Sequence, residues 1–171
     1  MEENGLPAVG QLEATPEILR GLLCELTEED AQWKPAPDRF SVAEVLAHLS
    51  HSEDHCYRLR LDRFMNEERP ELEPDEAQFY LNLYRNADPV YSLDHFEELR
   101  ESNIEFLRHL PKGAGERRAI HKEAGEITLA QMLHEWAMHD LGHIRQIAEL
   151  VRARKHLAGA GELGKSYQLK P

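Results

Sequence analysis

Two segments of the chain carry the same helix-start signal. Residues 40–45 (Phe-Ser-Val-Ala-Glu-Val) and 127–132 (Ile-Thr-Leu-Ala-Gln-Met) each place a serine or threonine three residues before Glu or Gln, with apolar residues on both sides. This is a capping box inside a hydrophobic staple. Each signal opens a long segment in which apolar residues recur with the period of an α-helix, and no segment alternates as a strand would. The sequence therefore predicts an all-α protein.

The four longest periodic segments predict an up-down four-helix bundle with additional short helices. The first is expected from a Thr15 cap, with Pro16 at its first helical position, to about residue 26. The others are expected over about 41–66, 92–110 and 128–156, with a short helical stretch near 76–85. A length of 171 residues is expected to make one domain, 1–171, with a core over about 12–155 and loose termini, including a glycine-rich tail.

The inward faces of two predicted helices contain histidines. On the second helix, His48 lies at the edge of a stripe formed by Val45, Leu49, Ser52, Cys56 and Leu59. On the last helix, His139 and His143 stand four residues apart, so they project side by side. They share their stripe with Met132, Trp136, Ile147 and Leu150.

Burying imidazoles among apolar groups is costly unless their nitrogens are satisfied. A single inward histidine is ordinarily a hydrogen-bonded core residue, but a pair at this spacing favours a metal ion, for which imidazole is the commonest protein ligand. His48 lies near the middle of its helix, at a depth similar to that of His139 and His143. Three histidines leave a coordination position open, as in catalytic zinc sites, and nickel, iron or manganese could also bind.

Several polar neighbours of these histidines have open roles. Asp140 follows His139 directly and Glu135 is one turn earlier, so either could orient an imidazole or carry a proton. His51 and His55 share a face with His48 and suggest a second metal, although the polar flank of an amphipathic helix explains them more simply.

Composition excludes several classes of partner. The formal net charge of -12 repels phosphate backbones and anionic lipids, so neither nucleic acid nor a membrane surface is an expected partner. No apolar run is long enough to span a membrane, and the acidic first residues do not resemble a signal peptide. Cys24 and Cys56 are interpreted as small core residues of a protein in the reducing cytoplasm.

Two motifs resemble the DinB-like superfamily, which includes the YfiT-like metal-dependent hydrolases. The early motif is Phe-Ser-Val-Ala-Glu-Val-Leu-Ala-His-Leu at 40–49, with Phe40 where tryptophan is common in the family. The late motif is His-Asp-Leu-Gly-His-Ile-Arg-Gln at 139–146. The resemblance implies a four-helix bundle, often dimeric, with a divalent metal on His48, His139 and His143. Relatives include transferases and isomerases that use low-molecular-weight thiols.

The histidine pattern and the composition thus predict a cytoplasmic metal-dependent enzyme that acts on a small molecule. The resemblance implies that this enzyme is a hydrolase or a low-molecular-weight-thiol transferase, and that it forms a homodimer. The alternative is a non-enzymatic metal- or ligand-binding stress-response module. A histidine phosphotransfer bundle is a more remote alternative, because it needs one exposed histidine and the notable ones face inward.

Overall fold

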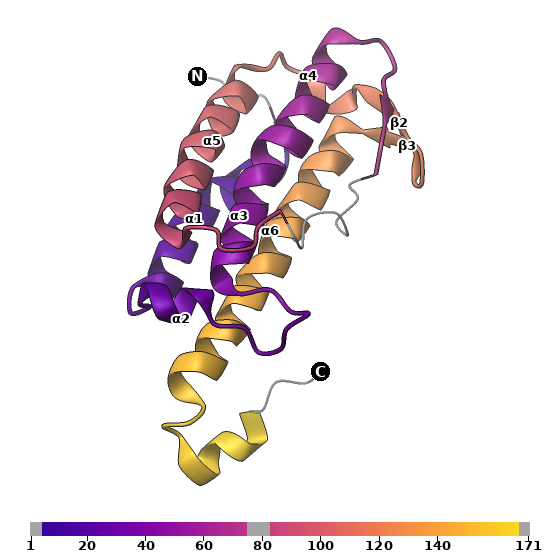
Figure 1. The fold of residues 1–171 in the computed structure, drawn as a ribbon. Helices are drawn as coiled ribbons and strands as arrows, with labels where there is room; N and C mark the ends of the chain where they lie inside the picture. The colour runs from indigo at the N-terminus through magenta and orange to yellow at the C-terminus, as the bar shows by residue number, and fades with distance from the viewer. Residues whose placement is uncertain (1–4, 75–82, 168–171) are drawn as a thin grey trace.

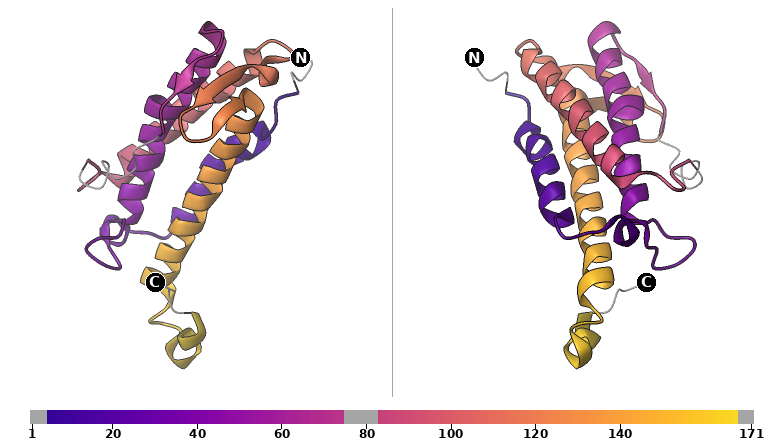
Figure 2. Two further views of the ribbon diagram at one scale, coloured as in Figure 1. Left: turned by 90° about the vertical axis from the view of Figure 1, so that its right-hand side faces the viewer. Right: turned by 60° about the vertical axis from the view of Figure 1, so that its left-hand side comes forward.

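Four long helical rods lie side by side in the computed structural model, which describes residues 5–74 and 83–167 (Figure 1). The second rod is continuous from Val42 to Asn66 and changes its helical type in the middle. The fourth extends past the other three (Figure 2). The rods are formed by α1 (Val9–Leu23), α3 (Val42–Ser52) with η1 (Glu53–Arg58) and α4 (Leu59–Asn66), α5 (Pro89–His109), and α6 (Leu129–Val151) with η4 (Arg152–His156). The predicted all-α four-helix bundle is confirmed.

The directions of the rods differ from the predicted up-down alternation. The second rod and α5 run parallel. Glu53 pairs with Arg100, and further along both rods Arg58 lies over the ring of Phe106. By contrast, α6 runs antiparallel to the second rod. The second rod ends with Asn66 at one end of the bundle, and α5 begins with Pro89 at the other (Figure 1). Two successive parallel rods do not fit the up-down topology of a bundle with short links only.

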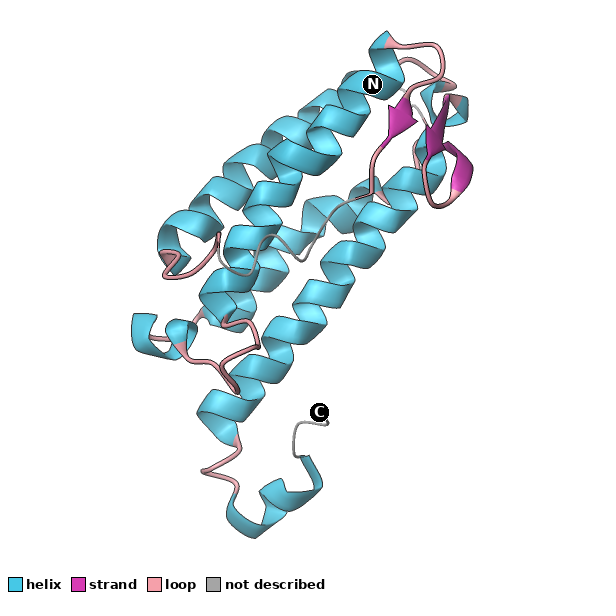
Figure 3. Ribbon diagram, turned by 45° about the vertical axis from the view of Figure 1, so that its right-hand side comes forward, coloured by secondary structure: helices cyan, strands magenta, loops and turns pink. Residues whose placement is uncertain are grey.

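A small sheet at one end of the bundle was not predicted (Figure 3). The strands β2 (Arg118–His121) and β3 (Gly125–Thr128) pair as an antiparallel hairpin, and β1 (Glu71–Leu72) adds parallel to β2. Strands of two to four residues are too short to show an alternating pattern in the sequence. The hairpin leads directly into α6, whose Thr128 cap and Gln131 form the predicted capping box.

Two predicted helix starts are wrong. Helix α1 begins at Val9, so Thr15 and Pro16 lie inside it rather than at its cap. Helix α5 begins at Pro89, and its cap is Asp88 instead of Ser92. The Asp88 carboxylate accepts hydrogen bonds from the amides of the first turn, and proline is well suited to the first helical position.

The π-helical segment η1 changes which residues of the second rod face the core. The predicted stripe holds as far as Ser52, but Leu59 is 55% exposed. A π-turn contains more residues than an α-turn, so the inward face moves by one position. Its buried residues are Glu53, Tyr57, Leu61 and Phe64. Glu53, the first residue of η1, lies four residues after Leu49 and continues the buried face of α3.

The interior has an apolar layer at each end and a polar layer between them. One apolar cluster gathers around Trp136, with Leu12, Tyr57 and Leu107. The other gathers around Leu49, Phe96 and Ile147. On each rod, buried polar residues lie between these two clusters or at their boundary. They include Thr15, His48, Ser52, Glu53, Arg100, Asn103 and Asp140.

The remaining predictions on the fold had mixed outcomes. The helix expected near 76–85 falls largely outside the described residues, and residues 83–86 form turns. The glycine-rich tail expected to be loose contains a 3-10 helix, η5 (Gly161–Tyr167). Both cysteines are free thiols, but Cys24 is exposed and so is not a core residue. Among the described residues, no helix combines the length and apolar character needed to cross a bilayer.

Candidate metal centre

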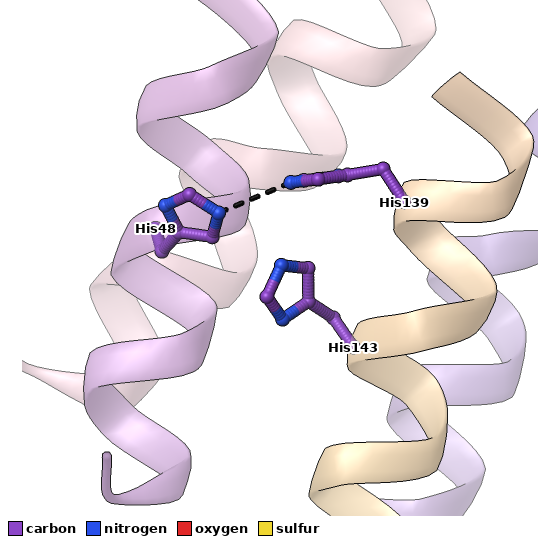
Figure 4. Close-up of side chains that lie close together, drawn as sticks. All are labelled: His48, His139 and His143. Carbon is purple, nitrogen blue, oxygen red and sulfur yellow. Dashed lines mark hydrogen bonds between the residues drawn. The ribbon is translucent and has the colours of Figure 1, made fainter. Parts of the chain in front are cut away.

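The structure brings together the three histidines singled out in the sequence (Figure 4). His48 comes from α3, and His139 and His143 come from successive turns on one face of α6. One ring nitrogen from each lies within 4.8 Å of the others, and the Nε2 atoms of His48 and His139 are 3.0 Å apart. His48 is 8% exposed and the His139 side chain 18%.

This donor set fits a divalent cation. Zinc–nitrogen bonds of about 2.0–2.1 Å at tetrahedral angles place ligand nitrogens about 3.3 Å apart, close to the separation of His48 and His139. Metal ligation requires neutral imidazole. Burial, together with the neighbouring rings of His143 and His139, lowers the pKa of His48 to about 3. Burial and the ring of His139 lower the pKa of His143 to about 4. Both rings are therefore neutral and ready to ligate at neutral pH.

Gln146 orients the ring of His143. The amide oxygen of Gln146 lies 3.0 Å from Nδ1 of His143, one helical turn away on α6. An amide oxygen can only accept, so this contact places the proton on Nδ1 and leaves the Nε2 lone pair free. Such an outer partner is a regular feature of histidine metal ligands.

The Nδ1 atom of His139 is buried and has no hydrogen-bond partner within the described chain. The carboxylate nearest to it is that of Asp140, with Oδ1 3.9 Å away. Burial alone would raise the pKa of the Asp140 carboxyl, but the His139 ring and the Arg100 guanidinium outweigh burial and lower this pKa. Asp140 is therefore ionised beside His139.

Asp140 also belongs to a buried cluster that sequence reasoning missed. Arg100 forms two hydrogen bonds with Glu53, through Nε and Nη2, and two with Asp140, through Nη1 and Nη2. Its remaining N–H donates to the carbonyl oxygen of Leu12 at 2.6 Å. That carbonyl is free because Pro16, four residues later, has no amide hydrogen. All five N–H groups of Arg100 are thus used.

Three other side chains complete this cluster. The Trp136 indole and the Asn103 amide both donate to Glu53 at 3.0 Å, and the Thr15 hydroxyl donates to Asp140 at 2.7 Å. Two sequence signals were available. Arg100 is a charged residue within the apolar spacing of α5, four residues after Phe96, and Glu53 lies four residues after Leu49 on the apolar face of the second rod.

The other predicted site residues lie outside the group of three histidines. Glu135 is exposed and accepts a long hydrogen bond, 3.4 Å, from the buried Tyr57 hydroxyl. Within the described chain, no hydrogen bond or ion pair joins Glu135 to a histidine of the group. His51 and His55 stack on each other with ring centroids 4.2 Å apart. Neither belongs to a group of three or more potential metal ligands among the described residues.

A cleft of about 1050 Å³ reaches the histidines from outside. Its walls are the loop before α3, one face of α6 with the start of η4, and the end of η5. His139 and His143 line it, and His48 faces them from α3 (Figure 4). The lining of the cleft also includes Asp38, Arg39, Phe40, Met138, Arg145, Glu149, Arg152 and Tyr167.

A helical bundle with three inward histidines from two facing helices defines a class of proteins with a metal site in the bundle core. The comparison with known families gives the particular family: the DinB superfamily matches residues 11–147, and the chain belongs to it.

Individual relatives agree with this assignment. A protein of Oceanobacillus iheyensis is 26% identical over 147 residues, which is 85% of each chain, and one of Bacillus licheniformis is 28% identical over 142 residues, 81% of this chain and 80% of the relative. Both carry provisional names as metal-dependent hydrolases. Among solved structures, YfiT from Bacillus subtilis matches with a TM-score of 0.75 and 27% identity over 85% of each chain. YfiT is described as a probable metal-dependent hydrolase with an unusual four-helix bundle topology.

Proposed function

We propose that this protein is a divalent-metal-dependent enzyme acting on a small molecule, with His48, His139 and His143 as the metal ligands. The observation that carries the proposal is the convergence of three ring nitrogens within 4.8 Å. The names of the relatives, which describe metal-dependent hydrolases, point in the same direction. A divalent cation held there supplies Lewis-acid chemistry, polarising a substrate or making a water molecule more acidic.

The cleft favours catalysis over a purely structural role for the metal. A structural zinc site is closed by four protein ligands, whereas a catalytic site keeps one position for water or substrate. Among the described residues, the histidine group contains three potential ligands, and two of them line a cleft. A binding module in which metal only stabilises the fold is the alternative, and it gives no role to this cleft.

The two acidic residues have different tasks in this proposal. Asp140 is buried and held by Arg100 and Thr15, so it positions the His139 ring and does not exchange protons with substrate. Glu135 is exposed and one turn before His139, so it is the proton carrier of the proposed mechanism. The Tyr57 hydroxyl of η1 donates a hydrogen bond to its carboxylate.

Metal analysis tests the proposal. Protein without a histidine tag, loaded with zinc or nickel and then desalted, is expected to retain one equivalent of metal by mass spectrometry. His139→Ala is expected to retain none while keeping a helical circular dichroism spectrum. His134→Ala is the matched control, because His134 is an exposed histidine of the same helix. A metal-free wild type, or an H139A variant that still holds a full equivalent, would contradict the proposal.

The reaction class is settled by a separate experiment. Metal-loaded protein is offered ester and amide substrates with and without a low-molecular-weight thiol. Product formation without thiol identifies a hydrolase, whereas product that appears only with thiol, and contains it, identifies a transferase. In both cases E135Q is expected to lower turnover without changing metal content.

A further inference from the structure

The cleft beside the histidines contains two arginines whose side chains have no polar partner among residues 5–74 and 83–167. Arg39 and Arg145 are exposed, and no hydrogen bond or ion pair of either side chain occurs within the described chain. Every other arginine in the described residues has a polar, ionic or electrostatic contact. Arg152, for example, lines the same cleft and pairs with Glu149.

Unpaired arginines are unexpected in this protein. With a net charge of -12, carboxylates are plentiful, and arginines elsewhere find them. Among the residues that line the cleft, the charge of Arg152 is neutralised by its ion pair with Glu149. Two positive charges, those of Arg39 and Arg145, then remain beside one negative charge, that of Asp38. The cleft is therefore a locally positive region on an acidic surface, and it leads to a site suited to a cation. Such a region attracts small anions.

The cleft also offers apolar contact area. Phe40, Met138 and Tyr167 line it, and Met138 and Tyr167 are 72% and 60% exposed. A guanidinium fork matches the two oxygens of a carboxylate or phosphate. An apolar wall beside such a fork suits a ligand with a short apolar body and one anionic end.

We propose that Arg39 and Arg145 bind the anionic end of the substrate, a carboxylate or phosphate, and so direct an adjoining group of it towards His139 and His143. This inference rests on the proposed function of the histidines as the reactive centre. It adds the substrate class, a small amphipathic anion, and two residues that select it.

Arginine side-chain NMR tests the inference without an activity assay. Zinc-loaded protein is titrated with hexanoate and, separately, with inorganic phosphate, while the Nε–Hε signals of Arg39 and Arg145 are followed. We expect these signals to shift with hexanoate, phosphate or both; the more effective ligand identifies the anion. R39Q and R145Q should each weaken binding about tenfold, the loss expected for a charge-assisted hydrogen-bonded pair. Arg69→Gln, which neutralises an exposed arginine outside the cleft, should leave binding unchanged.

Zinc content, measured on the same samples, separates this inference from the proposed function. A double variant, R39Q/R145Q, is measured alongside. If the wild type holds zinc but binds neither anion, or if the double variant binds the anions as well as the wild type does, the inference fails and the metal site stands. If the wild type holds no zinc, the proposed function fails, and delivery to the histidines fails with it. Retention of zinc by R39Q/R145Q, together with loss of anion binding, supports both.

Discussion

Two polar clusters lie in the middle layer of the bundle, and they differ in how completely the protein satisfies them. In the carboxylate–arginine cluster of Glu53, Arg100 and Asp140, every N–H of Arg100 has an acceptor and no side chain is more than 1% exposed. In the histidine cluster of His48, His139 and His143, the rings converge at one point and Nδ1 of His139 has no partner in the described chain.

The difference indicates a structural role for the carboxylate–arginine cluster and a ligand-binding role for the histidine cluster. A buried polar group without a partner costs free energy, so a fold that retains one has a use for it or a ligand that satisfies it. The carboxylate–arginine cluster needs nothing more, and it ties α1, η1, α5 and α6 together. The histidine cluster gains most from an added cation. Asp140 belongs to the carboxylate–arginine cluster, and its carboxylate lies 3.9 Å from Nδ1 of His139 in the histidine cluster.

Loss of Arg100 is expected to give the largest effect. Arg100→Met leaves two buried carboxylates without a cation, and such a loss costs about 3–5 kcal/mol of unfolding free energy. Urea unfolding measures it at fixed metal concentration. R100K keeps the positive charge but loses the planar guanidinium with its five donors. Its unfolding free energy should lie between those of the wild type and R100M, and it provides a folded variant if R100M is too unstable. Arg108→Met, which breaks the half-exposed pair with Glu13, is the control. A loss no greater than in R108M would show that the carboxylate–arginine cluster does not hold the bundle together.

Zinc should stabilise the fold through the histidine cluster alone. At a free zinc concentration 100 times Kd, binding raises the unfolding free energy by about 2.7 kcal/mol. Unfolding with and without zinc is compared for wild type, His48→Ala and His51→Ala. The increase should disappear in H48A and persist in H51A, whose histidine lies on the same helix outside the cluster. If zinc stabilised H48A as much as the wild type, the histidine cluster would not be the zinc-binding cluster of the two.

The sequence was sufficient for those features that depend on local patterns. The capping boxes at Ser41 and Thr128 each consist of hydrogen bonds within four consecutive residues, and both are present. The spacing of His139 and His143 on the stripe of Trp136 follows from helix geometry alone. The depth of His48 followed from its position in the middle of a capped helix.

The features that were missed depend on contacts distant in sequence. The shift at η1 exchanges one hydrogen-bond register for another and has no clear local signature, so the burial of Tyr57 and Leu61 and the exposure of Leu59 were not predicted. The partners of Arg100 come from three other rods, and the carbonyl freed by Pro16 becomes an acceptor only because α5 packs beside α1. The parallel arrangement of the second rod and α5 is likewise held by contacts between residues distant in sequence, such as the pair of Glu53 with Arg100.

The contact between the two clusters is tested by Asp140→Asn. The substitution removes the negative charge beside Nδ1 of His139 and weakens one of the two carboxylate pairs of Arg100. Changes at outer partners of ligating histidines lower metal affinity by about 10–100-fold, and we expect a loss in this range. Competition with a chromophoric chelator measures it. The control is Glu135→Gln, which should leave zinc affinity near that of the wild type. If both variants bind zinc like the wild type, the clusters share a layer of the bundle but not a function.

The smallest expected effect concerns Gln146, which orients His143 without belonging to either cluster. Gln146→Ala removes the acceptor from Nδ1, so the ring samples both tautomers and zinc affinity should fall by about tenfold, the low end for an outer partner. Stability without metal should hardly change. Gln146→Glu keeps an acceptor and should restore affinity, because a carboxylate makes the ring a more basic ligand. Nitrogen NMR of the ring reports the tautomer directly. If Q146A keeps the proton on Nδ1 and the affinity of the wild type, packing rather than Gln146 sets the orientation of His143, and the histidine cluster is as fully determined by the fold as the carboxylate–arginine cluster.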